Sequence, residues 1–155
     1  MKKILFILTL IIGLMSFSNS AKASHVVGGD TQFIQTGPNT YKIIFRFFRY
    51  CSGIATPATL TNVRLLVNGT NALQTTVTAT KDSSVVLTFG DECYTPTGLC
   101  VEVYTYTGTA TIPNNPNGYY STYTTGARNP GLTNLVSGNS TWYSEIPNPA
   151  LAGGN

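Results

Sequence analysis

The sequence has few ionisable side chains. Charged residues make up 10% of its 155 positions, with one histidine and six carboxylates, whereas an ordinary soluble domain has about a quarter charged. General acid–base catalysis needs such groups held close together, and we find no Gly-x-Ser-x-Gly, no glycine-rich phosphate loop and no zinc-ligand spacing beside them. We therefore expect no enzyme activity, no catalytic residue, no cofactor and no metal. The adjacent Asp91 and Glu92 leave calcium binding open.

The chain also lacks an apolar run of about 20 residues, the length that spans a bilayer. Its longest apolar stretch, Ile4 to Met15, follows two lysines and precedes the small-residue sequence Ala21-Lys22-Ala23. This order is typical of a secretory signal peptide and predicts cleavage after Ala23. We therefore expect an exported protein, secreted or held at the cell surface, without a transmembrane span.

Without the signal peptide, the chain has no excess of positive or negative charge. The whole chain has a formal charge of +3, and three of its lysines lie in residues 1–23. The remaining part carries six positive and six negative side chains. Binding through phosphates requires a surplus of Lys and Arg, so we expect no nucleic-acid partner. The chain divides into a signal peptide (1–23), a folded domain (24–147) and a linker or truncated end (148–155). It is a possible fragment of something longer.

Threonine and tyrosine are abundant instead. The sequence has 23 threonines after residue 30 and nine tyrosines, and both residue types favour strands over helices. Alternation of apolar and polar residues then predicts short strands. Two turns connect them most clearly: residues 37–40, and Asn68-Gly69, the strongest short hairpin signal. The expected strands are Asp30 to Thr36, Tyr41 to Phe48, Val63 to Val67, Leu73 to Thr80, Val85 to Phe89, Leu99 to Ile112 (one bent strand or two, with Gly108 as a bulge), Tyr119 to Thr125 and Ser140 to Glu145. About eight antiparallel strands at short spacing predict an all-β, Ig-like β-sandwich.

Three cysteines follow the cleavage site, and an exported protein meets oxidising conditions. The Pro and Gly between Cys93 and Cys100 let that loop turn back, so we favour a Cys93–Cys100 disulfide with Cys51 unpaired. The alternative is that Cys51 pairs with one of them across the sandwich.

Aromatic side chains gather near the end of the sequence. Trp142, Tyr143, Tyr119 and Tyr120 are candidates for a ligand-facing platform, although strand aromatics also pack in cores and across strands.

Six segments occur in a recognisable order: Ser24 to Asp30, Asn39 to Ile43, Phe48 to Gly53, Cys93 to Glu102, Gly118-Tyr119-Tyr120 and Ile146-Pro147. Together they are similar to the amino-terminal region of large Bacteroidota cell-surface proteins of the gliding-motility-associated kind. The resemblance implies an adhesin-like protein with Ig-like or PKD-type β-domains, exported through the type IX secretion system.

The sequence departs from that family at three places. Gln35 and the Gly126-Ala127 pair stand where cysteines are usual, and Tyr50 stands where an acidic residue is usual, so the family's disulfide pattern does not carry over. The expected role is a non-catalytic structural or adhesive domain, with other domains of a longer surface protein, surface glycans or proteins as partners. The alternative is a carbohydrate-binding module.

Overall fold

The computed structural model describes residues 26–53, 55–90, 98–126 and 139–146, and all of its regular structure is β-strand. The signal peptide and the linker predicted at the two ends lie outside these residues. The strands are β1 (Val26–Gly37), β2 (Thr40–Tyr50), β3 (Thr59–Val67), β4 (Leu73–Leu87), β5 (Val101–Thr111), β6 (Tyr119–Thr125) and β7 (Ser140–Ile146). Every strand pair is antiparallel.

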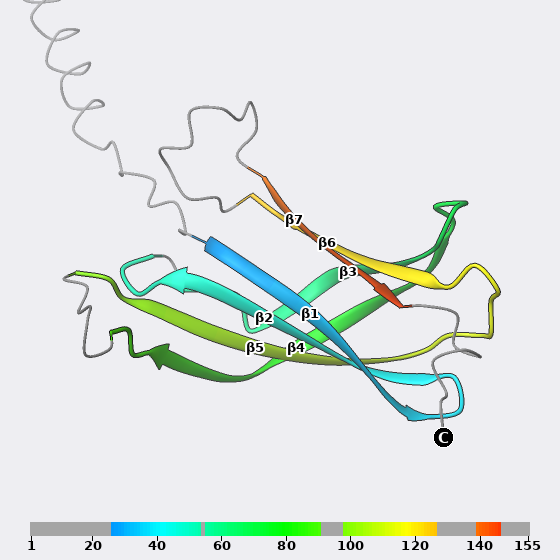
Figure 1. Cartoon of the computed structure of the whole chain (residues 1–155), viewed down its shortest axis with the longest axis horizontal. Helices are drawn as coiled ribbons and strands as arrows, with labels where there is room; N and C mark the ends of the chain where they lie inside the picture. The colour runs from blue at the N-terminus through cyan, green and yellow to red at the C-terminus, as the bar shows by residue number, and fades with distance from the viewer. Residues whose placement is uncertain (1–25, 54, 91–97, 127–138, 147–155) are drawn as a thin grey trace, which may run out of the picture.

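The strands form two layers, as Figure 1 shows. One layer has the order β1-β2-β5-β4 and the other β3-β6-β7, and the β3–β4 hairpin joins them into a single folded-over sheet. This is the ABED and CFG order of a constant-type immunoglobulin domain. The predicted all-β, Ig-like sandwich is therefore confirmed, with seven strands among the described residues in place of about eight.

Strand β4 combines two segments that the sequence predicts as separate strands, one from Leu73 to Thr80 and one that begins at Val85. It runs without a break from Leu73 to Leu87, and a register shift between Lys81 and Ser83 takes the place of the expected loop. A β-bulge of this kind bends a strand and increases its twist without ending it, which lets β4 pair with β3 in one half and with β5 in the other.

The β3–β4 hairpin forms as predicted, but its turn is longer than a two-residue Asn-Gly turn. The loop runs from Asn68 to Ala72, and the amide of Val67 donates to the carbonyl of Ala72 at 2.8 Å. Positive φ occurs at Gly69 (79°) and Asn71 (59°), residue types that tolerate the left-handed region.

Gly108 is not a bulge. It pairs in register with Ile43 of β2, and its missing side chain instead makes room for β4. A Cβ there would lie 2.6 Å from Cγ1 of Val77 and 3.0 Å from the carbonyl oxygen of Thr78. The glycine therefore permits a close approach between two strands.

The core lies between the layers. Alternate residues of β2 face it, as the sequence pattern indicates: Tyr41, Ile43, Phe45 and Phe47 are all buried. Phe47 is central, because its ring makes edge-to-face contacts with Tyr106 (5.5 Å between centroids), Tyr123 (5.6 Å) and Trp142 (4.6 Å). Each such aromatic pair stabilises by about 0.5–1.5 kcal/mol beyond the area that it buries.

Candidate functional site

The four aromatic residues expected to face a ligand divide between the two sides of their layer. Tyr119 is fully buried and donates its hydroxyl to the carbonyl of Pro113 at 2.8 Å. Trp142 is partly buried and packs against the core beside Phe47. The prediction is therefore wrong for these two residues, because neighbours in a strand point to opposite faces and theirs is the inner one.

Tyr120 and Tyr143 lie on the outer side of the same layer, side by side on β6 and β7. Their ring centroids are 5.1 Å apart with planes tilted by 35°, and Tyr143 is 55% exposed. The hydroxyl of Tyr120 donates to Oδ1 of Asn71 at 2.8 Å, and that of Tyr143 contacts Oε1 of Glu145. This contact raises the pKa of Tyr143. We call Tyr120, Tyr143, Asn71 and Glu145 the tyrosine face.

The disulfide joins Cys51 to Cys100, with 5.5 Å between Cα atoms. The favoured Cys93–Cys100 pairing is therefore wrong, and the alternative partner, Cys51, takes the place of Cys93, which lies outside the described residues. The physical reason is strand pairing. Tyr50 pairs with Val101 at the end of the β2–β5 ladder, and the next amide, that of Cys51, donates to the carbonyl of Cys100 at 3.1 Å.

A buried charged group lies beside this disulfide. Arg49, 7% exposed at its side chain, donates to Oε2 of Glu102 at 3.1 Å and to the carbonyl of Gly53 at 2.7 Å. Tyr104 donates its hydroxyl to the same carboxylate oxygen at 2.7 Å. The bond from Tyr104 is the main cause that lowers the pKa of Glu102, and Arg49 adds to it. Glu102 is thus held ionised by a structural cluster at the ends of β2 and β5.

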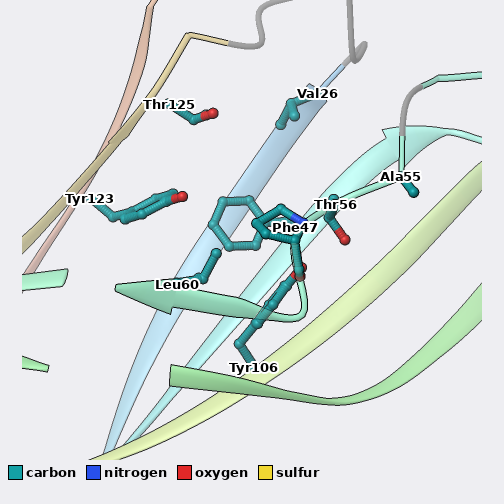
Figure 2. A pocket seen from close by; sticks show the side chains of 9 residues that line it. Val26, Phe47, Ala55, Thr56, Leu60, Tyr106, Tyr123 and Thr125 are labelled. Carbon is teal, nitrogen blue, oxygen red and sulfur yellow. The ribbon is translucent and has the colours of Figure 1, made fainter. Parts of the chain in front are cut away.

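Figure 2 shows a small pocket between the layers, with Phe47 at its centre and Tyr123 and Tyr106 on two sides. Burial raises the pKa of both phenols, and Tyr106 donates its hydroxyl to the carbonyl of Pro57 at 2.8 Å. The volume of the pocket is about 60 Å³. A buried water needs at least about 10–15 Å³ on this measure, so the pocket holds a few waters at most and has no room for a sugar ring.

An exposed apolar region covers the outer side of the β1-β2-β5-β4 layer, around a shallow groove of about 590 Å³. Val85 on β4 is 60% exposed and pairs with Val103 of β5, which in turn pairs with Phe48 of β2. We call this region the apolar surface. Its residues are Val27, Phe48, Val85, Leu87, Phe89, Leu99, Val101 and Val103.

In the part of the chain that the structure describes, no three His, Cys, Asp or Glu side chains come together as a metal site requires. Asp91 and Glu92, the residues for which calcium stays open, lie outside that part. The described residues also include no apolar helix of membrane-spanning length.

Comparison of the chain with protein-family models, with curated proteins and with solved structures finds no significant match.

Proposed function

We propose that this chain is a non-catalytic extracellular β-sandwich domain of a secreted or cell-surface protein. Its role is structural or adhesive and is linked to surface attachment or gliding motility. The apolar surface carries the proposal. Contiguous exposed apolar patches on soluble domains mark contacts with other molecules. Val85 is 60% exposed near the end of β4 and has apolar neighbours on β5 and β2.

The partner that we assign to the apolar surface is a neighbouring domain of the same surface protein. Interfaces between domains of one chain are of moderate size and less apolar than obligate interfaces. The apolar surface offers a docking site for such a neighbour, since a shallow groove with an apolar floor (Val101, 7% exposed) is bordered by half-exposed Leu99 and Phe89. The Cys51–Cys100 disulfide supports an extracellular location, because such bonds persist in oxidising compartments.

The test uses the complete reading frame that contains this chain, displayed on cells. Val85→Lys together with Leu87→Lys places two charges on the apolar surface. We expect cell attachment to a glass surface to fall at least about fivefold, because burying two unpaired charges in an interface costs several kcal/mol.

The matched control is Thr78→Lys, since Thr78 is an exposed residue of the same strand outside the apolar surface. Surface display of each variant, measured with an antibody tag, must equal that of the wild type. Attachment that is unchanged by the double substitution, with display intact, contradicts the proposal.

A second candidate, carbohydrate binding, rests on the tyrosine face. Two adjacent tyrosine rings give an aromatic surface on which the apolar side of a sugar ring packs. Glu145 and the side-chain amide of Asn71 supply acceptors and donors at the rim. This face does not overlap the apolar surface, because the two lie on the outer sides of different layers.

A glycan array probed with residues 24–155 tests this second candidate. We expect binding that Tyr143→Ala abolishes and that Tyr143→Phe retains in part, since Phe keeps the ring and loses the contact with Glu145. An array without signal, or a signal equal for wild type and Tyr143→Ala, eliminates it.

A further inference from the structure

The two edges of the folded-over sheet, β1 and β7, face each other without forming a ladder. Near the start of both strands they touch. The indole of Trp142 lies over Gly29, where a Cβ would be 2.1 Å from Nε1, and Ser144 donates its hydroxyl to the carbonyl of Thr31 at 3.3 Å. These contacts advance in step, so β1 and β7 run in the same direction. We call the space between the two strands the seam.

The seam opens toward the β1–β2 turn, where β7 ends and β1 continues (Figure 1). The opening is a groove of about 530 Å³ between Phe33 and Gln35 on one side and Ser144 and Ile146 on the other, with Tyr41 beneath. Among the described strands, none closes the sandwich into a barrel here.

The edge of β1 presents backbone hydrogen-bonding groups to this groove. The carbonyl of Thr31 points toward β7, because it accepts the Ser144 hydroxyl. Backbone groups of a strand repeat with a period of two residues, so the N–H and C=O groups of Phe33 and Gln35 also point away from β2 and into the seam. Among the described residues, no strand pairs with these backbone groups in a β-ladder. An unpaired row of this kind is a template for another strand.

A buried hydroxyl in the same groove also lacks a partner. Tyr41 is 2% exposed, and its hydroxyl makes no hydrogen bond with any described residue. Burial raises the pKa of Tyr41, so the phenol is a neutral donor. A buried polar group without a partner is costly, and a carbonyl brought into the groove would remove that cost.

We propose that the seam binds an extended peptide segment of another polypeptide, which adds to the free edge of β1 as a strand. Charge selects its sequence. Glu145 is the one charged residue among the described residues that line the groove, so the segment carries Lys or Arg on its outward side and apolar side chains on its inward side, against Phe33 and Ile146. Main-chain hydrogen bonds give such strand addition its affinity, and alternate side chains give its specificity. The proposal is independent of the apolar surface, and the groove shares only Glu145 with the tyrosine face.

The probe is a fluorescein-labelled peptide, acetyl-Lys-Val-Thr-Val-Lys-Val-amide, titrated with the mature chain and followed by fluorescence anisotropy. We expect saturable binding that weakens at least about tenfold when the peptide amides on one edge are N-methylated, because each lost hydrogen bond costs several-fold in affinity. A peptide with Glu in place of Lys is expected to bind more weakly than the Lys peptide, and Glu145→Gln to remove the difference between them.

Two variants of the chain test the two sides of the argument. Gln35→Pro removes a seam-facing N–H, and Pro is tolerated on a free edge. Tyr41→Phe removes the unpaired hydroxyl. Each substitution is expected to weaken peptide binding by about fivefold. The control Thr109→Ala, an exposed change on β5 outside the groove, is expected to leave the affinity unchanged.

Thermal melts establish that each variant of the chain is folded. If a variant is not folded, the comparison of the Lys peptide with its N-methylated form tests strand addition without it. The proposal is overturned if the Lys peptide fails to bind at millimolar concentration, or if N-methylation leaves its affinity unchanged.

Discussion

Removal of the Cys51–Cys100 disulfide should reveal how much of the stability of this sandwich depends on tying β2 to β5. The bond closes a loop with a sequence separation of 49. The chain-entropy relation for a loop of that length gives about 4 kcal/mol, against about 2.5 kcal/mol for the short loop between Cys93 and Cys100. The variants Cys51→Ser and Cys100→Ser are therefore each expected to have a free energy of unfolding about 4 kcal/mol lower than the wild type. For a domain of this size that lowers the melting temperature by roughly 15 °C.

The assay is urea unfolding of the oxidised mature chain followed by circular dichroism, for each single Cys→Ser variant. Cys93→Ser is the matched control, and its free energy of unfolding should be within about 0.5 kcal/mol of wild type because it leaves the Cys51–Cys100 bond intact. Peptide mapping without reduction should recover a linked pair that contains Cys51 and Cys100. A loss on Cys93→Ser equal to that on Cys100→Ser, with Cys51→Ser silent, would refute the reasoning, because it would place the bond within the short loop.

Two further predictions concern the packing of β4 on β5 and the charged cluster. Gly108→Ala should destabilise by about 1–3 kcal/mol through overpacking against Val77. The double variant with Val77→Ala should lose less than the sum of the two single changes in urea unfolding, and strict additivity would show that the two sites do not touch. Glu102→Gln should cost about 1–2 kcal/mol at pH 7, less than for a wholly buried pair because the carboxylate is partly exposed. Since folding lowers the pKa of Glu102, this stabilisation is complete above its ordinary pKa of 4.5 and is lost as pH falls through the lowered pKa. The wild-type advantage in a pH series should accordingly shrink below pH 4.5, and an advantage that grows on acidification would contradict the assignment.

The positions of Tyr119 and Trp142 show what the period-two alternation of a strand can predict and what it cannot. Alternation alone implies that Tyr119 and Tyr120 point to opposite faces, and likewise Trp142 and Tyr143. It does not say which face is covered. That depends on the pairing of Tyr119 with Ile146 and of Tyr123 with Trp142, which turns one set toward Phe47. A four-residue platform was therefore excluded by periodicity, while the choice of the outer pair needed the assembled layers.

The alternating apolar residues at the end of β4 carry the same lesson. Val85 and Leu87 are two positions apart and therefore share a face of the strand, which is the pattern that a core-facing strand also shows. In the structure they point outward, because the bulge after Lys81 shifts the register of this half of the strand. The apolar surface was thus visible in the sequence as a pattern but not as a surface.

The sequence by itself determined the class of fold: period-two alternation, abundant threonine and tyrosine, and turn residues between short runs specify antiparallel strands through local sterics and the polarity of each face. It also fixed the β1–β2 and β3–β4 hairpins, since strands separated by a short turn have little choice of partner. Only the tertiary structure decided the β2–β5 pairing, and with it the Cys51–Cys100 bond. That pairing joins residues about 50 to 70 positions apart, so its register is set by the burial of whole faces in a common core and not by any local signal.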